Sequence, residues 1–230
     1  MTHLHPRGVN HLALSTTDMK GQLEFWCDVV GLPLKALYWM HGAKGAYHGF
    51  VELAPDSYVA LVQMPENSKD MEFGVSHANG PGGDIRGGTM QHVAFHVDTL
   101  ADVLGMRDRL RSRGVQVLGP IDHGFIQSIY FDGPEGLNLE ICCGSDIDGE
   151  AWIDPEVVGL CGITEAELEA LKEPAAFVST AQPVPQPTSP HPTSVQDPNT
   201  PAWFARVIGL PDEEVWERMS ETTPPVRPEG

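Results

Sequence analysis

Two histidines and one glutamate lie in short apolar segments where their side chains could do metal chemistry. His11, His92 and Glu140 occur within VNHLAL (9–14), MQHVAF (90–95) and LNLEI (137–141). In a strand, successive side chains alternate between two faces, so the apolar neighbours of each residue take the opposite face and can pack on a helix. Two imidazoles and one carboxylate that converge form the ligand set of non-haem Fe(II) sites, which leave positions open for substrate and dioxygen. The sequence therefore predicts a metal site made of these three residues.

An internal repeat explains how these residues could converge. The segment at 90–95 resembles the one at 9–14, and both carry His in third place. An aspartate follows each segment (Asp18 and Asp98) and is suited to begin a helix. A single core histidine more often only satisfies a hydrogen bond, whereas two at equivalent places of a repeat favour metal binding. We expect helices over 19–30 and 99–113, each ended by a glycine that tolerates the left-handed conformation, Gly31 and Gly114.

Each repeat continues through three further strands, so both are predicted to be βαβββ modules. Strands are expected at 33–38, 50–55 and 58–63 in module one, and at 115–118, 129–132 and 137–141 in module two. The fold class is α+β, with two modules (8–64 and 89–144) closing a cupped mixed sheet within a domain of residues 1–145. Aligning Pro55 with Pro134 places Leu61 opposite Glu140, with Gln63 on the same face.

With these motifs, the chain resembles the vicinal oxygen chelate superfamily over residues 8–144. The segments Ile121-Asp122-His123, Ile129-Tyr130, Pro134-Glu135-Gly136 and Glu140 resemble the signature of type I extradiol ring-cleaving dioxygenases. Gly133 departs from that signature, which usually has Asp, Glu, Asn, Thr or Ala there. The resemblance implies an Fe(II) enzyme that cleaves a small catecholic or related aromatic substrate with O2, in aromatic compound catabolism. It also implies metal ligation by His11, His92 and Glu140, with His123 and Tyr130 acting near the bound oxygen and the substrate.

One feature of that family is missing. Ring-cleaving members usually carry a further acid/base histidine before the last strand of the first unit, where this chain has Asp56-Ser57-Tyr58. His48 and His77, the latter in the glycine-rich loop 73–88, are the candidate replacements.

Two other functions and other metals remain open. A His2Glu site also binds Mn(II) or Zn(II). Metal-dependent isomerases, epimerases and lyases of the glyoxalase type use the same modules, usually with a fourth protein ligand. Leu61 has no ligand atom, so Gln63 would have to fill that role. A non-catalytic resistance protein that binds small molecules is the third reading, and such proteins often lack the metal triad.

Composition restricts the possible partners. The 230 residues carry 32 acidic and 14 basic side chains, for a formal charge of −18, which disfavours nucleic acid and anionic membrane surfaces. No apolar stretch approaches the roughly 20 residues of a membrane span, and residues 1–8 have no secretory pattern. The four cysteines show no CxxC spacing. We therefore expect reduced thiols and a cytoplasmic location.

Beyond the modules, three segments differ in composition. Residues 146–173 are acidic, with a helix expected at 164–172 whose Thr164 and Glu167 have capping-box spacing. Residues 174–201 are rich in proline and read as an extended linker. Residues 202–230 form an amphipathic helical arm that Pro211 divides, with Asp212 starting its second piece. The arm would pack on its own subunit or on a second copy in a homo-oligomer.

Overall fold

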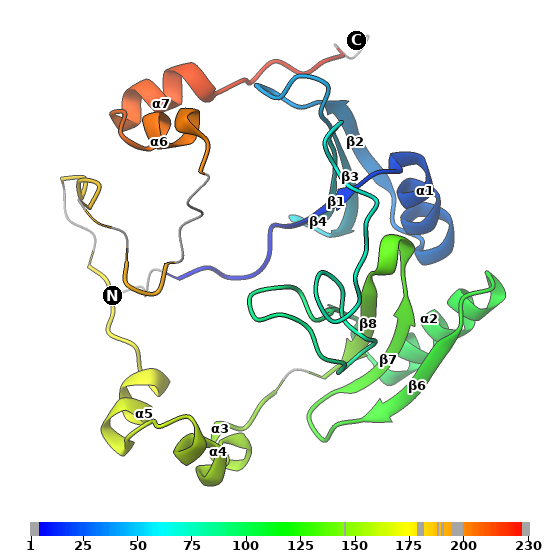
Figure 1. Ribbon diagram of the computed structural model, residues 1–230. Helices are drawn as coiled ribbons and strands as arrows, with labels where there is room; N and C mark the ends of the chain where they lie inside the picture. The colour runs from blue at the N-terminus through cyan, green and yellow to red at the C-terminus, as the bar shows by residue number, and fades with distance from the viewer. Residues whose placement is uncertain are drawn as a thin grey trace. The chain divides into compact units, whose positions relative to one another are not determined.

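A computed structural model describes residues 5–144, 146–178, 182–187, 189, 191–194 and 200–226 (Figure 1). The chain divides into two compact units, one of Pro6–Pro174 and one of Ala175–Gly230 with Met1–His5. The first unit contains every residue that the sequence nominates for chemistry.

Both modules have the predicted βαβββ order. In the first, the sheet order is β1-β4-β3-β2, with β1 parallel to β4. Its elements are β1 (His11–Thr16), α1 (Met19–Glu24), a π-helical segment (Phe25–Val30), β2 (Leu34–Trp39), β3 (Tyr47–Ala54) and β4 (Ser57–Gln63). In the second, the order is β5-β8-β7-β6. Its elements are β5 (Val93–His96), α2 (Leu100–Ser112), β6 (Val117–Asp122), β7 (Gln127–Asp132), a 3-10 turn (Pro134–Gly136) and β8 (Asn138–Cys143). The predicted α+β class and the duplicated module are confirmed.

The helix ends show where local sequence signals succeed. The Asp18 side chain accepts a hydrogen bond from the backbone N–H of Gly21, as an N-cap does, and Gly31 adopts φ 101° after the helix. The predicted cap at Asp98 is wrong by one residue. Thr99 begins α2 instead, because its hydroxyl accepts from the backbone of Asp102 while the Asp102 carboxylate accepts from the backbone of Thr99. This reciprocal capping box satisfies two donors rather than one.

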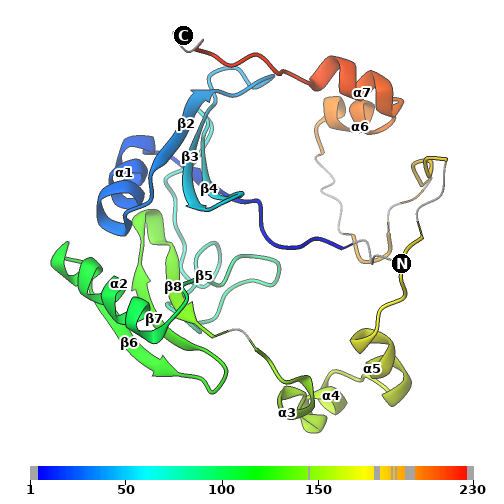
Figure 2. The same ribbon diagram turned by 180° about the vertical axis from the view of Figure 1, so that it is seen from behind.

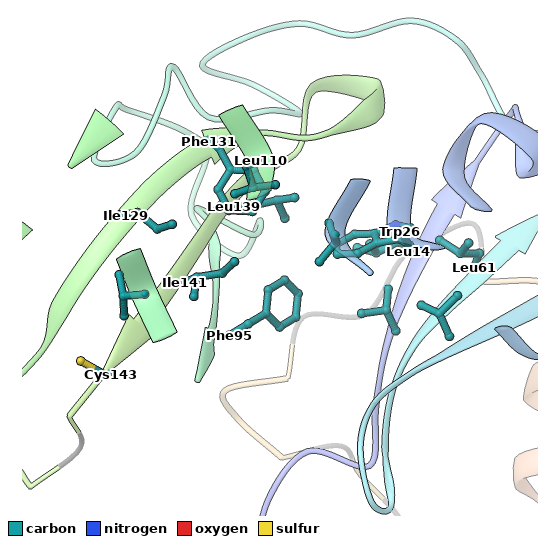
Figure 3. Close-up of a cluster of buried hydrophobic side chains, with 14 of the residues drawn as sticks. Leu14, Trp26, Leu61, Phe95, Leu110, Ile129, Phe131, Leu139, Ile141 and Cys143 are labelled. Carbon is teal, nitrogen blue, oxygen red and sulfur yellow. The ribbon is translucent and has the colours of Figure 1, made fainter. Parts of the chain in front are cut away.

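The two modules share one hydrophobic core. Figure 3 shows Trp26 of module one close to Phe95 of module two, and their rings meet edge to face at 5.7 Å. Apolar residues of both modules surround them, namely Leu14, Val51, Leu61, Val103, Leu110, Ile129, Leu139 and Ile141. The strand faces expected to be apolar are therefore the ones that pack inward. In each sheet the histidine-bearing face is the opposite one.

A partly buried carboxylate also joins the modules. Glu135, in the turn before β8, accepts four hydrogen bonds from module one, all between 2.6 and 2.8 Å: two from Thr17, one from Thr16 and one from Gln22. Burial by itself would raise the pKa of Glu135, but the hydrogen bonds from Thr16, Gln22 and Thr17 outweigh it and lower that pKa below its ordinary value. We call this set of hydrogen bonds the Glu135 clamp.

The rest of the chain forms short helices. The acidic segment has α3 (Gly149–Trp152), α4 (Pro155–Leu160) and α5 (Glu165–Lys172), the last with the predicted capping box of Thr164 and Glu167. Sequence periodicity missed α3 and α4 because each spans fewer than two turns. The arm has α6 (Ala202–Ile208) and α7 (Asp212–Met219), separated at Pro211 as predicted (Figure 2). The predicted linker at 174–201 lies partly outside the described residues. Among the described helices, none is long and apolar enough to cross a membrane.

Candidate metal centre and its surroundings

His92 and Glu140 form a close pair on the second sheet. Glu140 lies in β8, only 2% exposed, and its Oε2 is 2.9 Å from Nε2 of His92, just before β5. Within the described structure, Glu140 Oε1 is buried without a hydrogen-bond partner. A buried carboxylate with an unmet oxygen is costly, and a divalent cation would remove that cost.

Gln91 sets the orientation of the His92 ring. The Gln91 amide nitrogen faces two carbonyl oxygens, those of Gly80 and Gly83, so its oxygen must be the atom directed at His92 Nδ1. Nδ1 then carries the proton, which leaves a lone pair on Nε2 in the neutral ring. Two acceptors, Nε2 and a carboxylate oxygen, then face each other at 2.9 Å. Such a contact is stable only with a cation or a proton between them, so this pair fits a metal.

Tyr130 and His123 lie beside the pair. Tyr130 stands opposite Glu140 in the β7–β8 register, and its ring meets that of His92 edge to face at 6.0 Å. The Tyr130 hydroxyl is 2.9 Å from Nε2 of His123. Burial, and then the negative charge of Glu140, raise the pKa of Tyr130. The phenol therefore remains a hydrogen-bond donor at neutral pH. Four of the seven predicted site residues lie together on this face.

His11 and His48 belong to a second cluster, on the polar face of the first sheet. The His11 ring meets Phe50 edge to face at 5.8 Å, and its Nδ1 is 2.9 Å from Oδ1 of Asn10. The ring centroids of His48 and Phe50 are 4.5 Å apart, and the Tyr38 ring stacks on Phe50 with a centroid distance of 6.3 Å. Burial, and then the proximity of His11, lower the pKa of His48. Its buried Nε2 has no partner within the described structure. A neutral imidazole among aromatic rings is the result.

The third predicted ligand is not beside the other two. Among the described residues, no group of three or more His, Cys, Asp and Glu side chains is placed to hold a metal ion. The fold explains this separation, because each histidine face lies opposite the core that the modules share. Of the three predicted ligands, His92 and Glu140 thus lie together, and His11 lies on the other sheet.

His77 has different neighbours. Its Nδ1 is 2.8 Å from the Ser76 hydroxyl, and its ring packs against Phe73. It also lies against the turn before β8, where a Cβ on Gly136 would come within 3.0 Å of it. His77 lines a cavity that contains none of His11, His92, Tyr130 and Glu140.

The expected partner of Glu140 in module one is wrong by one residue. Ala94 pairs with Glu140 in module two, and Ala13 pairs with Ala60 in module one, so Ala60 is the structural counterpart of Glu140. The turn after Pro134 is one residue longer than the turn after Pro55, and aligning the prolines hid that difference. Ala60 offers no ligand atom.

The side chains of Leu61 and Gln63 are both committed elsewhere. Leu61 is fully buried in the core. Gln63 Oε1 accepts a hydrogen bond from the backbone N–H of Met19 at 2.8 Å, at the start of α1. Gln63 therefore supports the start of α1. Neither Leu61 nor Gln63 is placed to act as a fourth metal ligand.

Sequence reasoning overlooked the amide that precedes each histidine. Asn10 precedes His11 and Gln91 precedes His92, and each amide oxygen is directed at Nδ1 of its histidine. The repeat contained this signal, since both modules place an amide residue before the histidine.

Comparison with known proteins agrees with this architecture. Residues 8–141 match the family model of the Glyoxalase/Bleomycin resistance protein/Dioxygenase superfamily. The chain belongs to this superfamily. The resemblance inferred from the motifs is thereby confirmed at the family level.

Individual members of the superfamily are distant. Biphenyl-2,3-diol 1,2-dioxygenase 2 of Rhodococcus globerulus is 27% identical over 132 residues, which cover 57% of this chain and 60% of that protein. A probable lactoylglutathione lyase of Synechocystis sp. is 23% identical over 135 residues, covering 57% of this chain and 91% of that protein. The solved structure of a glyoxylase/bleomycin resistance protein/dioxygenase domain from Frankia sp. EAN1pec matches with TM-score 0.50 and 14% identity, over 61% of this chain and all of that one. This structural match concerns the fold alone.

Proposed function

We propose that the protein is a metal-dependent extradiol-type dioxygenase that cleaves a catecholic or related aromatic substrate with O2. The observation that carries the proposal is the buried Glu140 carboxylate paired with His92, beside the hydrogen-bonded Tyr130 and His123. The distant likeness to a biphenyl-diol dioxygenase supports the same chemistry. When bound, a divalent cation, Fe(II) here with Mn(II) or Zn(II) as alternatives, would acidify a chelating diol and activate it towards O2.

The residues of the second sheet have separate roles in this proposal. His92 and Glu140 hold the cation, and Gln91 keeps the His92 lone pair on Nε2. Tyr130 donates its hydroxyl proton in a hydrogen bond to the anionic oxygen of the substrate. His123, in contact with that hydroxyl, accepts or donates a proton during the reaction.

His11 remains the proposed third ligand, and the packing of the two modules supports a contribution from a second copy. Arg109 of α2 donates hydrogen bonds to the backbone carbonyls of Asp28 and Val29, and the Glu135 clamp adds a second tie, so the modules are held together on their core sides. The two histidine faces are directed away from that core. We therefore propose that the protein is a homo-oligomer in which His11 of a second copy completes the site. The prediction that the 202–230 arm packs on its own subunit or on a second copy stays a prediction.

The test is metal analysis of anaerobically purified protein, with oxygen uptake on a panel of catechols that includes biphenyl-2,3-diol. We expect stoichiometric iron, oxygen consumption and ring-opened products. His96→Ala is the control variant. His96 is an exposed histidine on the same face of β5 as Ala94 and the preceding His92, so its loss should leave the metal content and oxygen uptake unchanged. Metal-dependent turnover without oxygen uptake would contradict the proposal in favour of the glyoxalase type. Ligand binding without metal would favour the resistance type.

A further inference from the structure

A cavity of about 760 Å³ lies outside the predicted metal centre. It is bounded by β1, the loop that follows β4, and the turn that holds Glu135. None of His11, His92, Tyr130 and Glu140 is among the described residues that line it. Its volume is in the range of small-molecule sites.

One residue of the cavity lining carries an unsatisfied hydrogen-bond acceptor. Asn138 lines the cavity and is only 5% exposed. Its Nδ2 donates to the carbonyl oxygen of Ala78 at 3.1 Å, which fixes the orientation of the amide because a carbonyl requires a donor. Asn138 Oδ1 is buried and has no hydrogen-bond partner in the described part of the chain. A ligand N–H or O–H group that reached this oxygen would satisfy it.

The charges around the cavity favour a cation. Its lining contains three carboxylates, those of Glu66, Asp70 and Glu135, against the one ammonium group of Lys69. Glu135 stays ionised because the clamp donors stabilise its charged form and lower its pKa. A cavity lined mainly by one sign of charge concentrates ligands of the opposite sign.

Part of the remaining lining is apolar. Leu12, Leu14, Met71, Met90 and Leu137 line the cavity and would contact a hydrocarbon chain. Methionine side chains are flexible and polarisable, so they adapt to chains of different length.

We propose that this cavity binds a small aliphatic amine in its ammonium form. The ammonium group donates a hydrogen bond to Asn138 Oδ1 within the field of the carboxylates, and the alkyl chain lies against the apolar residues. The cavity shares none of His11, His92, Tyr130 and Glu140 with the metal centre, although Gln91, which orients His92, also lines the cavity.

Four six-carbon probes test the proposal on the full-length protein: hexylamine, 1,6-diaminohexane, 1-hexanol and hexanoate. Titration calorimetry is carried out with EDTA present, so that no metal–amine complex contributes. We expect hexylamine and 1,6-diaminohexane to bind, 1-hexanol to bind at least about tenfold more weakly because charged hydrogen bonds are the stronger ones, and hexanoate not to bind. Equal binding of hexylamine and hexanoate would overturn the proposal, as would no binding of either amine.

Variants then locate the site. Asn138→Leu should weaken hexylamine binding by about tenfold or more, with folding checked by circular dichroism. If that variant does not fold, Asp70→Asn and Lys69→Gln decide the matter. The first should weaken and the second should strengthen binding by about threefold each, as expected for exposed charges. Glu213→Gln on α7 removes an equal charge outside the first unit and should leave binding unchanged. Identical affinities for all the variants would show that the amine binds elsewhere.

Discussion

At the scale of single residues, the amide before each histidine matters as much as the histidine. Gln91 selects the His92 tautomer that presents a lone pair at Nε2. The sequence predicts the faces of His92 and Glu140 because strand alternation is a strong local rule. It does not predict the ring orientation, which depends on the contact of Gln91 with carbonyls of the glycine-rich loop.

Removing that amide should loosen the metal. Gln91→Leu leaves His92 Nδ1 without its acceptor, and we expect about 10- to 100-fold weaker metal affinity, the usual effect of removing such a supporting group. Competition with a fluorescent chelator measures this affinity. Gln186→Leu, in the second compact unit, is the control and should leave it unchanged. Unaltered affinity in Gln91→Leu would mean that this amide does not orient a ligand.

Tyr130 should affect turnover rather than metal content. Tyr130→Phe removes the hydroxyl that contacts His123, and we expect kcat to fall by about 100-fold, within the range for a proton-transfer or hydrogen-bonding group. Iron content by mass spectrometry should stay at the wild-type level. His123→Ala should have a similar effect, and the double variant should cost little more than either single one because the two act as a unit. Additive losses would show that the two residues act independently.

At the scale of elements, turns decide what sequence reasoning can recover. The succession of strands and helices along the chain follows from periodicity and caps, and most of the predicted elements match the structure. The alignment of β4 with its counterpart β8 was wrong by one residue because the turn after Pro134 contains one more residue than the turn after Pro55. One residue exchanges the two faces of a strand, which is why the counterpart of Glu140 is Ala60 rather than Leu61.

The longer turn holds the Glu135 clamp, and its charge should matter for stability. Glu135→Gln keeps the shape of the side chain but directs an NH2 group at hydroxyl or amide donors. We expect a loss of about 1–3 kcal/mol in the free energy of unfolding at pH 7, as for buried donors left unsatisfied. Urea denaturation measures this change. Glu165→Gln on the exposed face of α5 is the matched control and should change little.

The pH dependence of the clamp has a definite sign. The pKa of Glu135 is lowered in the folded protein from an ordinary value of 4.5, so its stabilisation is complete above that ordinary value and is lost as the pH falls through the lowered one. The stability difference between wild type and Glu135→Gln should therefore be constant between pH 7 and 5 and should shrink below 4.5. A difference that does not depend on pH would show that the carboxylate charge is not what holds the clamp.

At the scale of the whole molecule, the arrangement of the modules is what the sequence left open. The repeat indicates two modules, and a cup that unites His11 with His92 and Glu140 is the simplest way to assemble them. Which faces of the two modules meet depends on long-range packing, such as Trp26 against Phe95, and on the Glu135 clamp. Neither interaction has a signature in the local sequence. As the modules pack through their core sides, the three proposed ligands divide between the faces of two sheets of one chain.

Mixing two inactive variants tests whether a second copy reunites these ligands. His11→Ala removes one part of the site and Glu140→Ala the other, so each variant alone should be inactive. After subunit exchange, a mixed dimer has one site with both residues intact, and a 1:1 mixture should recover about one quarter of the wild-type oxygen uptake. A mixture of His92→Ala and Glu140→Ala should recover nothing, because these residues belong to the same half and every mixed site keeps one defect. Native mass spectrometry verifies that exchange has occurred. If exchange is complete and the first mixture stays inactive, His11 does not act across copies, and the third ligand must be sought within the same chain.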